Sequence, residues 1–183
     1  MATVILRPSL TNSQTGWAAD PLVTASDNDL STGVAQNNIT CSWVARLADL
    51  DSSLSGATIN SFTISANATP GRAGACDAIL SLVHATDGIF LNETEAWVGG
   101  NSTRTTTART TQQDGSSALT YTYINDCDIK INPNNQGMTL YELWVTVDYT
   151  PAGYGHEVNN VAAASIAKVK GVATASIAKV TGV

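Results

Sequence analysis

The residues that could take part in chemistry are few in this chain, and they occur singly. The sequence has two histidines, His84 and His156. His84 falls in an apolar stretch, where a hydrogen-bonded histidine of the core or sheet face is far more common than a catalyst. His156 follows Gly-Tyr-Gly, which predicts an exposed hinge. No G-x-S-x-G nucleophile motif occurs. The sequence therefore predicts no catalytic residue, no cofactor and no enzyme.

Closely spaced acidic residues could bind a hard cation such as Ca²⁺, which prefers clustered oxygen ligands. No EF-hand spacing surrounds them, and aspartates are also common in tight turns. We expect turns here and no metal site. The acidic pairs are Asp49 with Asp51, Asp126 with Asp128, and Asp27 with Asp29.

The three cysteines, Cys41, Cys76 and Cys127, are an odd number without C-x-x-C spacing. One disulfide could form among them. Three buried free thiols are the favoured alternative, because isolated cysteines in apolar stretches behave as small core residues.

Four tryptophans could serve as platforms on which sugar rings stack. Trp43 and Trp144 lie in predicted strands and are expected in the core or an interface, and Trp17 is expected to pin a polar loop to the body. Trp97 stands beside two glycines, which makes it the best candidate for an exposed ring. A glycan site near Trp97 is thus one alternative, and core packing, the commoner fate of an aromatic side chain, is the other.

Composition describes one domain of 183 residues, 43% of them hydrophobic and only 13% charged. Residues 1–157 hold all 15 acidic residues and six basic ones, whereas residues 158–183 hold three lysines and no acid. An acidic body argues against nucleic-acid binding, which needs cations that neutralise phosphates. The basic tail suggests attachment to an acidic protein surface, with a simply solvated tail as the alternative.

Neither a secretion signal nor a membrane span is expected. The first residues lack the basic start and long apolar run of a signal peptide. No apolar stretch approaches the roughly 18 residues that a membrane-spanning helix requires.

The elements that position these residues read as strands separated by Gly, Asn, Asp and Pro turns, at a spacing of roughly 8–12 residues. The clearest strand is Leu140–Thr150, in which Tyr141, Leu143 and Val145 are expected to share one face. Residues 119–124 are also predicted to be a strand, and residues 11–36 a long loop. The pattern predicts an all-β body over residues 1–153, an antiparallel β-sandwich or jelly roll.

Residues 154–183 are predicted to be an extended attachment tail. They end in two copies of an 11-residue unit, residues 162–172 and 173–183, which are identical at nine of eleven positions. A continuous helix would keep one face in register over 11 residues, but Gly171 and the β-branched valines disfavour it. Short extended pieces that pair with a strand edge on a partner are favoured, with a helix or an unstructured tail as alternatives. The expected partner-binding residues are Ile166, Lys168, Val169, Lys170, Val172, Ile177, Lys179, Val180 and Val183.

The strand LWVTVDYTP over residues 143–151, followed by V-N-N-V and repeated S-I-A-K-V-x-G-V units, resembles virion proteins of tailed bacteriophages. The resemblance implies a non-enzymatic structural protein of the virion, assembled in the host cytoplasm. A head decoration or cement protein is the favoured role, with other virion proteins, the major capsid protein above all, and copies of itself as partners. One alternative is a tail, neck or fibre protein whose β-sandwich binds host glycan, and a further one is a secreted or surface-anchored bacterial β-sandwich.

Overall fold

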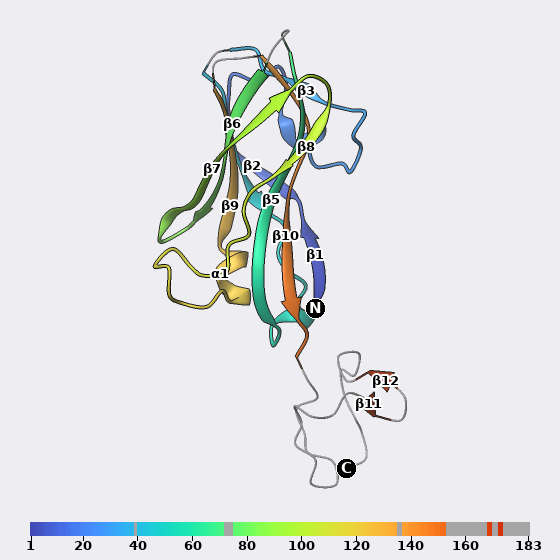
Figure 1. Ribbon diagram of the computed structural model, residues 1–183, viewed down its shortest axis with the longest axis vertical. Helices are drawn as coiled ribbons and strands as arrows, with labels where there is room; N and C mark the ends of the chain where they lie inside the picture. Colours follow the sequence, from blue (N-terminus) through green and yellow to red (C-terminus); the bar gives the residue numbers. More distant parts are fainter. Residues whose placement is uncertain (39, 72–74, 135–136, 153–167, 170–171, 174–183) are drawn as a thin grey trace.

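The computed structural model describes the whole chain except residues 39, 72–74, 135–136, 153–167, 170–171 and 174–183 (Figure 1). Two antiparallel sheets pack face to face, which confirms the predicted β-sandwich. The predictions for His156 and for most of the tail lie outside the described residues.

The first sheet is built around its longest strand pair, which runs the length of the sandwich (Figure 1). Its strand order is β1 (Ala2–Leu6), β10 (Met138–Thr150), β5 (Thr58–Pro70) and β8 (Ser102–Thr105), and β3 (Val34–Ala35) pairs with the start of β10. β1 and β10 are antiparallel with Ala2 opposite Tyr149. The chain therefore leaves the last body strand beside the first residue of β1.

The second sheet has the order β2 (Pro8–Thr15), β4 (Ser42–Leu47), β9 (Cys127–Asn134), β6 (Ala75–His84) and β7 (Gly88–Val98). Short 3₁₀ turns lie at Pro21–Val23 and Ser52–Leu54. Residues 11–15, predicted as part of a loop, belong to β2. Its sequence is almost wholly polar because β2 is an edge strand that is mostly exposed.

The core lies between the sheets and is filled by the inward-facing residues of each strand. On β5 the predicted alternation is confirmed, because Phe62, Ile64 and Ala66 are fully buried. The ring of Phe62 meets that of Phe90 edge to face at 5.4 Å between centroids. The core cluster of the described residues extends from Leu6 to Val147.

β10 departs from the strict alternation that its sequence suggests. Its pairing with β5 shifts register between Leu140 and Glu142, so that Tyr141 turns away from the face shared by Leu143 and Val145. An extra residue in one strand reverses which side chains face inward. The prediction that Tyr141 shares the face of Leu143 is therefore wrong.

The predicted strand over residues 119–124 is instead a short helix, α1 (Tyr121–Asn125). The Thr120 side chain accepts a hydrogen bond from the backbone N–H of Tyr123, as an N-cap residue does. Tyr123 and Ile124 are buried against the core. A strand would direct the adjacent side chains of Tyr123 and Ile124 to opposite faces, whereas one helical turn buries both.

Two further strands lie within the predicted tail, β11 (Lys168–Val169) and β12 (Val172–Ala173). They pair antiparallel, with Val169 opposite Val172. The described part of the chain contains no helix long and apolar enough to cross a membrane.

Candidate functional site

Of the nine residues expected to bind a partner, the structure places Lys168, Val169 and Val172 in β11 and β12, and the others lie outside the described residues. Two residues, Lys170 and Gly171, separate the paired valines, which is the connection length of the tightest β-hairpins. The described tail residues are thus extended. Two valines separated by two residues also occur at residues 158–161 and 180–183 of the sequence.

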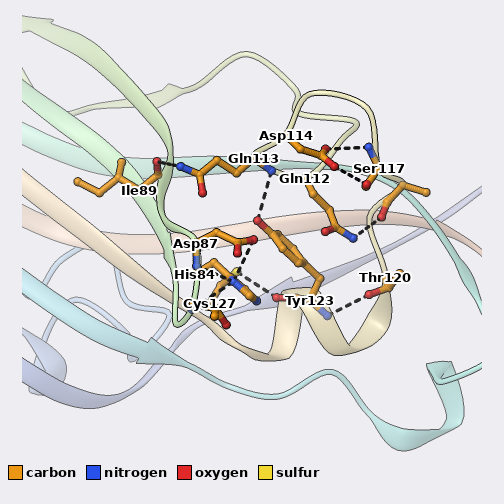
Figure 2. A network of polar contacts seen from close by, with 12 residues as sticks. His84, Asp87, Ile89, Gln112, Gln113, Asp114, Ser117, Thr120, Tyr123 and Cys127 are labelled. Carbon is orange, nitrogen blue, oxygen red and sulfur yellow. Dashed lines mark hydrogen bonds and ion pairs between the residues drawn. The ribbon is translucent and has the colours of Figure 1, made fainter.

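A second candidate site lies at the end of the sandwich where α1 meets the β6–β7 turn (Figure 2). The ring of His84 stacks on Tyr123 with 4.0 Å between centroids and 8° between planes. His84 Nδ1 faces the backbone N–H groups of Thr86 and Asp87 at 3.4 and 3.3 Å. It also lies 3.3 Å from an Asp87 carboxylate oxygen. The histidine is buried and hydrogen-bonded, as its apolar sequence context predicted.

Beside this stack is a hollow of about 410 Å³ lined by Asp87, Gln112, Gln113 and Asp114. Each glutamine amide group is held by the backbone, Gln112 Nε2 by Ala118 O at 2.7 Å and Gln113 Nε2 by Ile89 O at 3.3 Å (Figure 2). The Asp114 carboxylate accepts hydrogen bonds from Ser117, which lower its pKa to about 2. The lining consists of fixed amides and carboxylates, which suits a ligand rich in hydroxyl groups.

Two groups beside this hollow, Tyr123 and Cys127, are poorly suited to proton transfer near neutral pH. Burial raises the pKa of the Tyr123 phenol to about 12. Burial also raises the pKa of Cys127 to about 12, and its thiol donates to Tyr123 O at 3.2 Å. General acid–base catalysis is most effective when the pKa lies near the working pH. Tyr123 and Cys127 are therefore not poised to act as a general acid or base at this hollow.

The prediction that Trp97 is the best candidate for an exposed, sugar-stacking ring is wrong. It is fully buried, and its indole N–H donates to Ser102 O at 2.9 Å across the turn that follows β7. Trp43 is also fully buried, and Trp17 is buried beneath its loop, as predicted. Trp144 is partly exposed on the outer face of the first sheet.

The acidic pairs serve as turn and ion-pair residues. Asp51 caps the 3₁₀ turn at Ser52–Leu54 by accepting from Ser53 N. Asp126 and Asp128 lie 3.8 and 3.9 Å from Arg46 nitrogens. Among the described residues no cluster of three or more His, Cys, Asp or Glu side chains could hold a metal ion.

All three cysteines are buried with free thiols, which confirms the favoured alternative over a disulfide. Burial raises the pKa of Cys41 to about 12 and that of Cys76 above its ordinary value. A thiol with a raised pKa is rarely a thiolate at neutral pH and is a poor nucleophile or metal ligand.

Sequence reasoning missed the hollow because its residues come from two distant segments. Asp87 follows β6, and residues 112–114 lie between β8 and α1. The Asp-Gly pair at residues 114–115 is typical of a turn, but it does not indicate that Asp87 lies beside that turn.

No family model matches the sequence, and no curated protein is similar to it. Two solved structures of β-sandwich carbohydrate-binding modules resemble its fold. One is the C-terminal CBM6 of LamC, a marine laminarinase from Zobellia galactanivorans, with 11% identity, 80% of this chain and 98% of that chain covered, and a TM-score of 0.46. The other, described as "CBM4 structure and function", has 18% identity, 74% and 95% coverage, and a TM-score of 0.35. Neither likeness bears on what this chain binds.

Proposed function

We propose that this chain is a non-enzymatic structural component of a phage virion, a head decoration or cement protein. Residues 158–183 attach it to the shell or to neighbouring copies. The observation that carries the proposal is the tandem 11-residue repeat, which follows a body whose described residues enclose a core between two sheets, from Leu6 to Val147. A repeated short unit outside a complete core is typical of linear attachment, because weak contacts at many equivalent sites add up.

Three further features support the proposal. The tail is basic and the body acidic. The described tail residues are paired strands, a form that can add to a sheet edge on a partner. Burial raises the pKa values of Cys41, Tyr123 and Cys127 to about 12, so these three groups stay protonated near neutral pH and are not poised for catalysis.

Copy number in purified particles of the phage that encodes the chain tests the proposal. A decoration protein occurs in hundreds of copies arranged with the symmetry of the shell, and a particle reconstruction would show its density on the outer surface. A copy number of a few per particle would instead place the chain in a neck or fibre. Absence from purified particles would overturn the virion role altogether.

The hollow beside Tyr123 favours a second candidate function, binding of a host glycan by a tail, neck or fibre protein. Its two carboxylates and two fixed amides present acceptors to hydroxyl groups. A glycan array with the full chain and the Gln113→Ala variant tests this candidate. Binding that the variant loses supports it, and absence of binding to any glycan argues against it. The matched control is Gln36→Ala. Gln36 is a partly exposed glutamine that does not line the hollow, and its side-chain amide also donates to a backbone carbonyl, at 2.5 Å to Asn38 O.

A further inference from the structure

Each of the two sheets ends in edge strands, which have an unpaired side. All but one of these edge strands have a feature that disfavours pairing with a further strand. Edge strands of natural proteins are protected by bulges, prolines, charges or short length. β2 begins with a proline, and its pairing is interrupted by two register shifts. β7 carries Glu93 and Glu95, and the backbone N–H of Thr107 donates a hydrogen bond to the Glu93 carboxylate. β8 has four residues and includes an arginine, and β3 has two residues.

β1 is the exception. Its five residues, ATVIL, contain no charge, no proline and no bulge. It pairs with β10 on one side, and no hydrogen bond joins it to any other described residue. In an antiparallel strand, every second residue directs its N–H and C=O away from the partner. Ile5 is 49% exposed and Thr3, two residues before it, is also exposed. The unpaired edge strand therefore presents an apolar side chain to solvent.

The tail contains a segment that matches this edge in length and chemistry. The five residues S-I-A-K-V occur twice, at residues 165–169 and 176–180, with no proline and no acid. The end of the first copy is β11, which is already extended. The tail carries three lysines, and the body it would approach carries a net charge of −9.

We propose that the edge of β1 is the acceptor for an S-I-A-K-V strand from the tail of a second copy of this chain. The added strand extends the first sheet, and Ile5 is covered by the incoming apolar side chains. Each chain has one β1 edge and two S-I-A-K-V units, so donor units outnumber acceptor edges two to one, and a chain that fills an edge still has a second unit. Such a head-to-tail contact closes into rings or continues as a chain of subunits. This inference rests on the proposed attachment function and names its partner.

The test compares two lysine substitutions in the full-length protein by sedimentation velocity over a range of concentrations. Ile5→Lys places a charge on the open β1 edge. Leu10→Lys is the matched control, because Leu10 is 59% exposed on the bulged edge strand β2. We expect the unsubstituted chain to self-associate, Ile5→Lys to raise the apparent dissociation constant at least about tenfold, and Leu10→Lys to leave it nearly unchanged. Thr3→Lys, at the neighbouring exposed position, replaces Ile5→Lys if that variant melts abnormally.

A complementation experiment identifies the donor and the acceptor. The Ile5→Lys protein keeps its tail, and a protein with Ile166→Asp and Ile177→Asp keeps its β1 edge. Neither should self-associate alone, and a mixture of the two should recover association. A monomeric unsubstituted chain, equal effects of Ile5→Lys and Leu10→Lys, or no recovery on mixing would each overturn the inference. If truncation of the tail still abolished incorporation into particles, the attachment function would survive that result and only the β1 acceptor would be lost.

Discussion

The body and the tail differ in the kind and the arrangement of their apolar residues. In the body, large side chains such as Trp43, Phe62 and Leu143 are fully buried between two sheets. The tail repeats small and β-branched residues in short units, too few in each to enclose a core. From this difference we expect the stability of this protein to depend on residues 1–152, and the proposed attachment to depend on residues 158–183. Substitutions should therefore separate the two properties.

The largest expected effect on stability comes from a cavity in the body. Leu143→Ala should lower the free energy of unfolding by about 2–5 kcal/mol, because Leu143 is fully buried on β10. Ile177→Ala in the tail is the matched control and should change it by less than about 0.5 kcal/mol. Urea unfolding followed by circular dichroism measures both. Comparable losses would show that the tail belongs to the core.

A smaller loss is expected at the buried acidic residue of β10. Glu142 is 1% exposed, lies 3.4 Å from Arg7 Nε and accepts a hydrogen bond from Asn28 N. Arg7→Met leaves this carboxylate without its cation, which should cost about 1–3 kcal/mol at neutral pH. Incorporation into particles should persist at temperatures where the variant is folded. A stable variant that no longer incorporates would place an attachment contact on the body.

The same carboxyl makes stability depend on pH. Burial raises the pKa of Glu142 above its ordinary value of 4.5. The folded state thus holds the proton more tightly than the unfolded chain does. The resulting stabilisation is fully present below the ordinary pKa and is lost as the pH rises through the folded pKa.

Glu142→Gln removes this titration. The free energy of unfolding of the unsubstituted protein, minus that of the variant, should fall as the pH rises above about 4.5 and then level off. Urea titrations at a series of pH values measure it. A difference that increased with pH would mean that Arg7 outweighs burial.

The smallest effect concerns the cysteines. Reductant should change neither folding nor assembly, since all three thiols are buried and free. A thiol reagent should label them only as fast as the body unfolds, because burial suppresses the thiolates. Mass spectrometry of labelled, non-reduced protein measures both. A disulfide, or rapid labelling of the native state, would contradict the prediction.

The sequence predicted the sandwich wherever side chains alternate between core and solvent. Phe62, Ile64 and Ala66 show this on β5. The prediction failed at β2, whose polar sequence has no apolar face to detect. It also failed at α1, where one capped turn buries both Tyr123 and Ile124, which a strand would place on opposite faces. These are local ambiguities that tertiary packing decides.

The candidate sites could be predicted from the sequence less well than the fold could. Trp97 looked exposed beside two glycines, but its indole closes the turn by bonding Ser102 O. The hollow depends on Asp87 meeting residues 112–114, a contact between segments that no local pattern records. The repeat that suggested an attachment tail is visible in the sequence, and that prediction stays a proposal. The open edge of β1 could be found only from the strand pairing of the sheet.

Deletion of residues 158–183 tests the central claim most directly. Among the described residues the core cluster ends at Val147, and β10 ends at Thr150. We therefore expect the shortened chain to remain a soluble β domain that melts cooperatively within a few degrees of the full chain. In the same preparation it should no longer join particles, which quantitative mass spectrometry of purified virions measures. A shortened chain that fails to fold would show that the repeats complete the sandwich. One that folds and still incorporates at full copy number would show that the body carries the attachment surface.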